Sequence, residues 1–347
     1  MKVMNEVYHI PAMLQETIEG LNIQPQGVYV DVTFGGGGHS RAIIASIEEL
    51  SAQQGSTAST ESTKGKLYSF DQDLDAFQAE QKRAEENEGQ VLYGNPRWQF
   101  VHSNFRYLHN WMDYFGVEQI DGILADLGVS FHHFDCPERG FSFRYSAPLD
   151  MRMNQTAKLT AAHIINTYDE EELARIFWLY GELKSGRGIA KNICRARNQK
   201  AIERTEELIS IVLGRSVESL MSKQTDENGF IELNIPSDKK KDLARLFQAL
   251  RIEVNDEMGA LREMLIAARD LLKPGGRIAI LTYHSLEDRL VKNFLRSGNL
   301  EGTIEKDFYG NILTPFEVIE KGLTASEEEV ERNPRSRSAK LRVAEKK

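Results

Sequence analysis

Residues 30–40 decide the fold of this chain, and they read Val-Asp-Val-Thr-Phe-Gly-Gly-Gly-Gly-His-Ser. The stretch starts as a β-branched apolar run, which is typical of a buried strand. Four glycines follow, and His39 then begins a segment with helical character. A strand, a glycine turn and a helix form the ligand-binding corner of a doubly wound α/β sheet. A tight turn without a ligand is the alternative, but four glycines cost more backbone entropy than such a turn requires.

The glycine spacing indicates which class of ligand the corner accepts. A dinucleotide fingerprint reads G-x-G-x-x-G. Counted from Gly35, its last position is Ser40, and counted from Gly36 it is Arg41, so both frames fail. This disfavours an NAD-dependent dehydrogenase. The run that follows Asp31 is instead similar to the first motif of the class I S-adenosylmethionine-dependent methyltransferases.

Composition limits the class of protein. The chain has 347 residues, enough for one large domain or two smaller ones. Its 41% hydrophobic residues and mean hydropathy of −0.44 are typical of a soluble globular protein. The apolar runs are too short to span a bilayer and the first residues do not resemble a signal peptide, so we expect no membrane partner. Two cysteines without an export signal indicate free thiols in a cytoplasmic protein.

The distribution of charge matters more than its sum. The net charge of −9 by itself argues against non-specific nucleic-acid binding. Basic residues nevertheless gather in three segments, 184–204, 239–245 and 332–347. The helix expected over 186–197 carries Arg187, Lys191 and Arg195 at intervals of four, which places them on one face. Such a face is either an RNA-binding surface or an ordinary solvated one.

Three further strands end in groups that suit a nucleoside-bearing ligand. Residues 66–71 end in Asp71, whose carboxylate is placed to accept hydrogen bonds from ribose hydroxyls, or else to cap the next helix. Residues 98–102 are followed by Phe105, which either stacks on an adenine or packs in the core. The next strand, over residues 120–126, ends in Asp126, which the topological switch of the sheet brings opposite the glycine corner. A carboxylate there can hold an amino group of a cofactor or of a substrate.

The strand over residues 277–283 also ends in polar groups. Tyr283, His284 and Ser285 follow one another at its carboxyl end, where catalytic or substrate-binding residues lie in such sheets. Ser285 is alternatively an N-cap, with Asp288 completing a capping box.

The strand pattern stops in the middle of the chain. We expect a helical substrate-recognition domain over residues 137–244, inserted into a sheet domain made of residues 1–136 and 245–347. One long helix over residues 245–272 leads back into the sheet. The polar, low-complexity residues 49–65 are expected to form a flexible surface loop.

With these stretches in view, the chain resembles the bacterial small-subunit rRNA cytosine-N4 methyltransferases, the RsmH or MraW family. The similarity runs in order over nearly the whole chain. The matching segments are HIPAML at 9–14, DVTFGGGGHS at 31–40, DLGVS at 126–130, ERGFSF at 138–143, PLDMRM at 148–153, YGE at 180–182, FQALRI at 247–252, HSLEDR at 284–289 and NPRSRS at 333–338.

The resemblance implies both a fold and a reaction. The fold is a class I S-adenosylmethionine methyltransferase sheet, which is Rossmann-like, with an inserted all-helical domain. The reaction is transfer of a methyl group from S-adenosylmethionine to the exocyclic N4 of a cytosine. That cytosine lies in the decoding region, at the P site, of 16S rRNA in the small ribosomal subunit.

The resemblance also carries site residues over to the positions that match. The implied cofactor contacts are Gly36, Gly37, Gly38, His39, Asp71, Phe105, Asp126 and His133. The family usually has a glutamine where this chain has His133, so this contact departs from the pattern. The candidate RNA contacts are Arg139, Phe141, Phe143, Arg152, Arg187, Lys191, Arg195, Tyr283, Arg335 and Arg337.

Catalysis is expected to be mainly positioning, because the sulfonium is an excellent leaving group and the amine lone pair is delocalised into the ring. Asp126 is the first candidate to accept the hydrogens of the amine, and His284 or Ser285 is the second. No metal is expected, although His132 to Cys136 contains potential ligands. A small-molecule amine methyltransferase and a non-catalytic ribosome-assembly factor are the alternatives. The oligomeric state, monomer or homodimer, stays open.

Overall fold

A seven-stranded sheet organises the first of two units. The computed structural model describes residues 11–53, 65–86, 89–129, 136–226 and 229–347. The chain divides into one unit of residues 1–128 and 258–347 and a second unit of residues 129–257. The strands of the large sheet are β1 (Val28–Asp31), β2 (Lys66–Asp71), β3 (Trp98–His102), β4 (Ile120–Asp126), β7 (Leu272–Thr282), β8 (Phe316–Thr324) and β9 (Lys340–Lys346).

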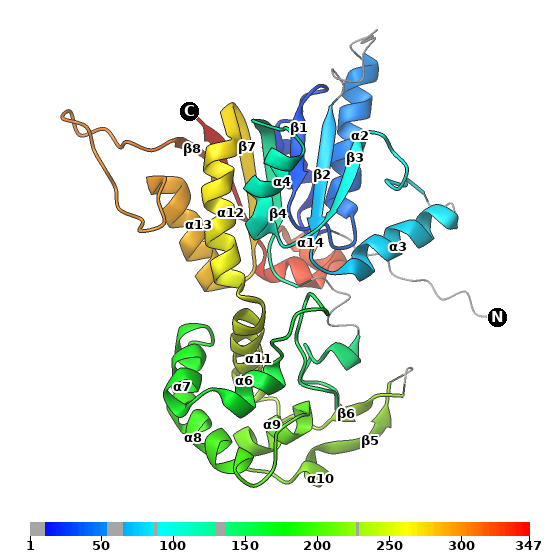
Figure 1. Cartoon of the computed structure of the whole chain (residues 1–347), viewed down its shortest axis with the longest axis vertical. Helices are drawn as coiled ribbons and strands as arrows, with labels where there is room; N and C mark the ends of the chain where they lie inside the picture. The colour runs from blue at the N-terminus through cyan, green and yellow to red at the C-terminus, as the bar shows by residue number, and fades with distance from the viewer. Residues whose placement is uncertain (1–10, 54–64, 87–88, 130–135, 227–228) are drawn as a thin grey trace. The chain divides into compact units, whose positions relative to one another are not determined.

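The order of these strands creates a switch point at β1. The order across the sheet is β3-β2-β1-β4-β7-β9-β8 (Figure 1). The first five strands are parallel, and β9 runs antiparallel to both β7 and β8. From β1 the chain moves outward through β2 and β3 and then returns to the other side of β1, where Asp31 pairs with Leu124 of β4. The predicted meeting of the ends of β1 and β4 is confirmed.

Helices cover this sheet and supply its core. They are α1 (Leu14–Leu21), α2 (Gly38–Gln53), α3 (Leu74–Glu85), η2 (Phe105–Tyr107), α4 (Leu108–Tyr114), α12 (Glu257–Leu271), α13 (Ser285–Ser297), α14 (Glu327–Arg332) and η4 (Pro334–Ser338). In α2, Ile43, Ile44 and Ile47 are fully buried in the same core as Leu67 of β2. Burying each of these side chains contributes roughly 1.5–3 kcal/mol, so packing holds α2 in place behind the glycines.

Helix α2 also corrects the predicted loop over 49–65. Residues 49–53 are its last residues rather than loop, because Leu50 still packs against the apolar core of this unit. Residues 54–64 lie outside the described residues.

The single helix predicted over 245–272 is two helices. Asp256 has a φ of 46°, a left-handed conformation that ends α11 (Lys240–Asn255) before α12 begins. Leu246 and Phe247 of α11 are buried in the core of the second unit. The division therefore falls at residue 257, whereas the sequence analysis placed the return to the sheet domain at residue 245.

The second unit is mostly helical and has its own core. Besides α11 it contains η3 (Pro137–Arg139), α6 (Ala161–Thr167), α7 (Glu170–Leu179), α8 (Gly186–Arg197), α9 (Thr205–Leu213) and α10 (Val217–Leu220). It also contains an antiparallel pair, β5 (Met221–Thr225) and β6 (Ile231–Leu233), so the expectation of an all-helical insert is corrected. Within the described part of the chain, no helix is both long enough and apolar enough to cross a membrane.

Candidate cofactor and catalytic site

The glycine corner joins β1 to α2 as the sequence predicts. Gly35 and Gly37 have φ angles of 50° and 71°, which favour glycine. A Cβ on Gly37 would lie 2.8 Å from Cζ of Phe34, so the corner also lacks room for a side chain there. Gly36 is exposed at the apex of the turn. The corner therefore carries no side chain at its exposed apex.

A buried polar network under the corner holds it in place. Asp31 is fully buried and accepts hydrogen bonds from the backbone N–H of Thr33 (3.0 Å) and from Oγ of Ser40 (2.6 Å). Oγ of Ser40 lies 2.8 Å from Oγ of Ser69, which accepts a hydrogen bond from Nε1 of Trp98 (2.9 Å). Burial raises the pKa of Asp31. This network links α2 to β1, β2 and β3, and none of its four side chains was predicted as a site residue.

Asp71 lies where a ribose-binding carboxylate is expected. It ends β2, and its Oδ2 accepts a hydrogen bond from the backbone N–H of Gly35 (2.8 Å). The alternative role as a helix cap belongs to Asp73, whose side chain accepts a hydrogen bond from the N–H of Asp75 at the start of α3. Phe105 is half-buried, and the N–H of Ser103 just before it donates to the carbonyl of Asp71 (2.9 Å). The loop that carries Phe105 therefore starts beside Asp71.

Asp126 lies at the end of β4, beside the corner. Its backbone N–H donates to Oγ1 of Thr33 (2.6 Å), which ties it to the residue after β1. Its Oδ1 accepts a hydrogen bond from the hydroxyl of Tyr283 (2.6 Å). Burial raises the pKa of Asp126 to about 7; the Tyr283 bond opposes the shift and the nearby Glu287 adds to it. This carboxyl therefore titrates near neutral pH.

His39 faces Asp126 from the start of α2. Its Nε2 lies 3.2 Å from the carbonyl oxygen of Ala12, and since a carbonyl only accepts, Nε2 carries the proton. Burial lowers the pKa of His39 and favours the neutral ring. The other ring nitrogen, Nδ1, then carries a lone pair and no proton. It lies 3.7 Å from Oδ2 of Asp126. His39 thus orients the corner and faces the carboxyl without adding a positive charge.

The residues that cap the start of α13 differ from the predicted ones. The N-cap is His284, not Ser285, and its capping box is completed by Glu287, not Asp288. Oε2 of Glu287 also accepts a hydrogen bond from the N–H of Tyr283 (3.0 Å), which fixes the backbone that carries the tyrosine. Ser285 is exposed in the first turn of α13. Of the three polar residues at this strand end, the side chain of Tyr283 is the one that contacts Asp126.

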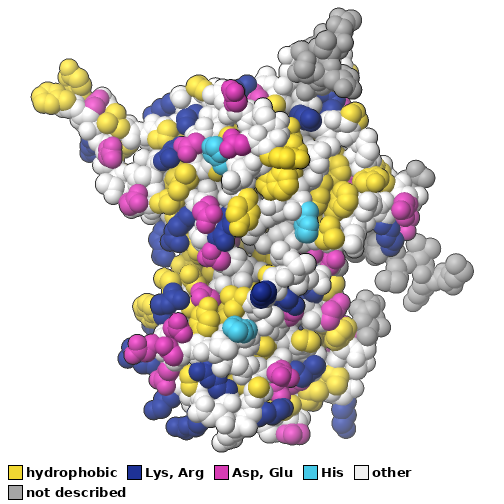
Figure 2. All heavy atoms as spheres, viewed as in Figure 1, with side chains coloured by type: hydrophobic (Ala, Val, Ile, Leu, Met, Phe, Trp, Pro, Cys, Tyr) yellow, Lys and Arg dark blue, Asp and Glu magenta, His cyan; other side chains and the backbone are white. Residues whose placement is uncertain are grey.

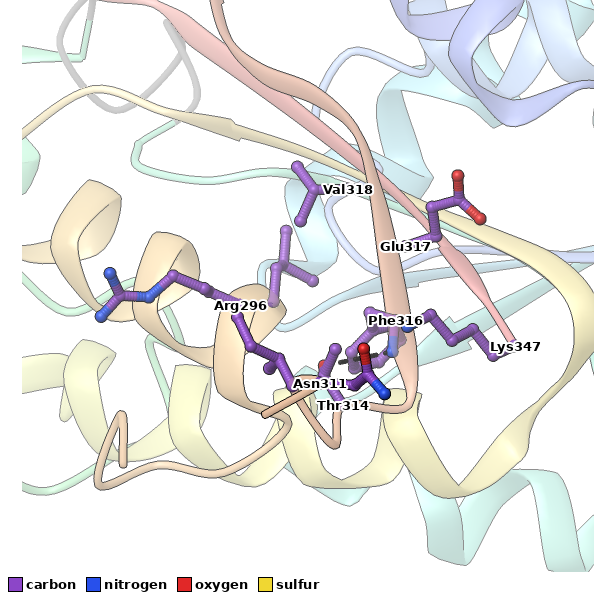
Figure 3. A pocket seen from close by; sticks show the side chains of 9 residues that line it. Arg296, Asn311, Thr314, Phe316, Glu317, Val318 and Lys347 are labelled. Carbon is purple, nitrogen blue, oxygen red and sulfur yellow. Dashed lines mark hydrogen bonds between the residues drawn. The ribbon is translucent and has the colours of Figure 1, made fainter. Parts of the chain in front are cut away.

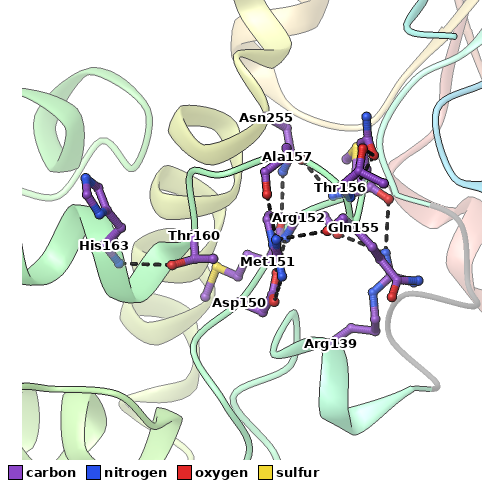
Figure 4. A network of polar contacts seen from close by, with 12 residues as sticks. Arg139, Asp150, Met151, Arg152, Gln155, Thr156, Ala157, Thr160, His163 and Asn255 are labelled. Atoms are coloured by element: carbon purple, nitrogen blue, oxygen red, sulfur yellow. Dashed lines mark hydrogen bonds and ion pairs between the residues drawn. The ribbon is translucent and has the colours of Figure 1, made fainter.

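Arg139 and Arg152, two of the predicted RNA contacts, stabilise a loop of the second unit. Arg139 is buried, and its Nη2 donates to the carbonyls of Arg152 (2.8 Å) and Met153 (3.1 Å) (Figure 4). Arg152 makes a two-pronged ion pair with Asp150, at 2.7 and 2.6 Å. Phe141 is 4% exposed and belongs to the core. These three side chains have structural partners within the second unit, and their contact with RNA stays a prediction.

Phe143 also packs inward. Its ring meets that of Phe247 edge to face at 5.8 Å between centroids, and it lies partly buried against the core of the second unit. His133, the cofactor contact that departs from the family pattern, lies outside the described residues.

The predicted basic helix face is present on α8. We define the basic face as Lys184, Arg187, Lys191 and Arg195, all of which are exposed. No carboxylate among the residues that the structure describes pairs with any of these four. Two neighbours are not part of it, because Arg197 donates to the carbonyl of Ile165 (2.7 Å) and Lys200 pairs with Glu207 (2.5 Å).

The basic face is local. On the side shown in Figure 2, lysine and arginine side chains are interspersed with acidic ones. Arg335 and Arg337 are a second exposed cationic group, on η4 of the first unit.

A cavity of about 410 Å³ lies elsewhere in the first unit. Figure 3 shows its lining, which comes from the end of α13, the segment before β8 and the C-terminal residue Lys347. Phe316 and Val318 supply apolar walls, and Arg296 lies at the rim. None of its lining residues is a predicted site residue.

Comparison with known proteins bears on the whole chain. Residues 6–347 match the model of the MraW methylase family. A protein of Phocaeicola vulgatus named ribosomal RNA small subunit methyltransferase H is 51% identical over 342 residues, covering 98% of each chain. Its namesake in Bacteroides thetaiotaomicron is 51% identical over 341 residues, again 98% of each chain. The one in Porphyromonas gingivalis is 50% identical over 346 residues, 98% of this chain and 97% of the relative. The chain belongs to the MraW methylase family.

Proposed function

We propose that this protein transfers a methyl group from S-adenosylmethionine to the exocyclic N4 of a cytosine in the decoding region of 16S rRNA. The observation that carries the reaction type is the pairing of Asp126 with Tyr283 beside the bare glycine corner. The substrate rests on the relatives, which are named as small-subunit rRNA methyltransferases and match nearly full length.

The residues at the corner fit the proposed cofactor. Gly37 has a positive φ and no space for a Cβ beside Phe34, so the corner keeps its tight turn, and the exposed Gly36 at its apex adds no side chain that would block a ligand. Asp71, bonded to the N–H of Gly35, supplies a carboxylate for ribose hydroxyls, and the half-buried Phe105 supplies a ring for the adenine. S-adenosylmethionine supplies a sulfonium-bound methyl group.

Asp126 has the properties required of the group that receives the amine. Ionised, it accepts a hydrogen bond from N4 and aims the nitrogen lone pair, which is a positioning effect. With a pKa of about 7, it is also matched to accept the proton that N4 loses on methylation. Tyr283 holds Oδ1 in place, and Glu287 fixes the backbone of Tyr283.

RNA contact is proposed for the basic face of α8 and for Arg335 and Arg337. These cations are exposed, and the four of the basic face (Lys184 just before α8, and Arg187, Lys191 and Arg195 on it) lack carboxylate partners among the described residues. Each phosphate that such a cation neutralises releases counterions and strengthens binding.

The experiment that tests this function supplies methyl-labelled S-adenosylmethionine with small ribosomal subunits that lack the modification, and in parallel with naked 16S rRNA. The label is expected on N4 of one decoding-region cytosine, located by digestion and mass spectrometry. Asp126→Asn serves as the inactive control, and Asp121→Asn, on the same strand but distant from its carboxyl end, as the matched active one. Absence of label from both RNAs would leave a non-catalytic assembly factor as the better reading.

A further inference from the structure

Trp178 is an exposed aromatic residue that the proposed function has not used. It lies in the last turn of α7 and 65% of its surface is exposed. By contrast, Trp98 is 8% exposed and its Nε1 is hydrogen-bonded inside the first unit. Leaving a large indole in water forgoes its burial energy, so an exposed tryptophan indicates a binding role more often than an exposed leucine does.

The turn between α7 and α8 brings Trp178 beside the basic face. The N–H of Glu182 donates to the carbonyl of Trp178 (3.1 Å), and the N–H of Leu183 donates to that of Phe177 (3.1 Å), so the chain folds back on the end of α7. A Cβ on Gly186 would lie 3.7 Å from the backbone nitrogen of Trp178. Arg187 follows Gly186 in the first turn of α8, so the start of the basic face lies close to the backbone at the end of α7 that carries Trp178.

The charge around Trp178 favours a polyanion. The basic face of α8 is exposed and has no carboxylate partner in the part of the chain that the structure describes. The acidic residues of α7 are Glu170, Glu171 and Glu172, in its first turn at the opposite end of the helix. Glu182 is the one acidic residue of the turn itself.

We propose that Trp178 stacks on an unpaired base of RNA whose phosphates lie along the basic face of α8. The proposal rests on the proposed function, since it assigns to Trp178 one of the contacts that bind the RNA substrate. A cationic track with an adjacent aromatic ring is the combination that binds single-stranded nucleic acid without sequence preference. The ring supplies the contact that distinguishes an unpaired base from a paired one, because paired bases hide their faces in the helix.

The test measures binding of the full-length protein to a short fluorescein-labelled single-stranded oligoribonucleotide and to a duplex of the same sequence. Trp178→Ala is expected to weaken single-strand binding about 5-fold or more, as removal of one base-stacking ring does, and to leave duplex binding unchanged. Trp178→Phe is expected to retain most of the affinity. Tyr114→Ala is the matched control, because Tyr114 is a 77% exposed aromatic residue on α4, which belongs to the other unit.

Two results separate this proposal from the proposed function. If Trp178→Ala binds both RNAs as the unchanged protein does, while Arg187→Ala with Lys191→Ala weakens both, the stacking proposal is overturned and the RNA-binding face stands. If none of these variants changes RNA binding, the whole surface is overturned as an RNA site and becomes a candidate for a protein partner. Either result leaves the label-transfer experiment to decide whether the protein is a methyltransferase.

Discussion

Asp31 and Asp126 end neighbouring strands of one sheet, and their surroundings differ sharply. Asp31 is fully buried and bonded to Thr33 and Ser40, in a network that reaches Trp98. Asp126 is 18% exposed, and its side-chain contacts are the hydroxyl of Tyr283 and the ring of His39. Burial raises the pKa of both carboxyls. The comparison teaches that burial alone does not mark a catalytic carboxylate. Partial exposure of its side chain beside the corner distinguishes Asp126, the proposed acceptor of the amine, from Asp31.

The largest expected effect is the loss of methylation activity when Asp126 is substituted. Asp126→Asn removes the charged acceptor for the amine and should lower kcat by roughly 10²–10³, as loss of a positioned acid–base group does. Cofactor affinity, measured by calorimetry, should change much less. Wild-type methylation by this variant would contradict the assigned role.

Asp31→Ala should act on stability and not on chemistry. It leaves the hydroxyl of Ser40 and the N–H of Thr33 without a buried acceptor, a loss of roughly 2–4 kcal/mol in the free energy of unfolding. Urea denaturation measures this loss. The folded fraction should methylate with nearly unchanged kcat at low temperature. A stable but inactive Asp31→Ala would break the comparison.

Tyr283→Phe tests whether the tyrosine tunes Asp126. The hydroxyl bonds the ionised carboxylate and so lowers its pKa, against the larger effect of burial. Without it the pKa rises above about 7, so a smaller fraction of Asp126 is ionised at neutral pH. We expect kcat at about pH 7 to fall roughly 3- to 10-fold and to recover partly at about pH 9. A uniform loss at all pH values would assign Tyr283 a purely steric role, and Tyr114→Phe is the control.

The last prediction concerns how the free energy of unfolding depends on pH through the titration of Asp126. Burial raises the pKa of Asp126 in the folded chain from 3.8 to about 7, so folding favours the protonated carboxyl. The free energy of unfolding contributed by this group is therefore complete below about pH 4 and is lost as pH rises through about 7. Asp126→Asn carries no charge, so it should be more stable than the unchanged protein by about 1–2 kcal/mol at about pH 8. The difference should shrink as pH falls and vanish only below about pH 4, where the carboxyl is protonated in both the folded and the unfolded chain. Thermal unfolding at both pH values measures it.

Much of the sheet and of the corner was predictable because local pattern decides them. Strands 66–71, 98–102 and 120–126 appear with the predicted bounds, since each is a short apolar run bounded by polar residues. The conformation of the glycine corner follows from residue type, because glycine adopts positive φ angles without the steric cost that other residues meet. The helix cap at His284 was missed, because histidine is not one of the usual capping residues.

The arginines show where local pattern is insufficient. Arg152 and Arg187 look alike in the sequence as basic residues outside the sheet. In the structure Arg152 pairs with Asp150 two residues away, whereas Arg187 stands exposed on α8 without a carboxylate partner in the described residues. Whether an arginine is free to bind RNA depends on what the folded chain places beside it.

The sequence by itself determined the strands that end at Asp71, His102 and Asp126, the glycine corner and the family, because these depend on residue type and short-range spacing. Only the tertiary structure decided that Tyr283 bonds Asp126 across 157 positions of sequence and that Ser40, Ser69 and Trp98 complete a network around Asp31. It also decided that Trp178 is left on the surface at the end of α7, whose backbone packs against Gly186 at the start of α8. The physical reason is that pKa, hydrogen-bond partners and exposure are properties of surroundings, and the surroundings come from residues distant in the chain.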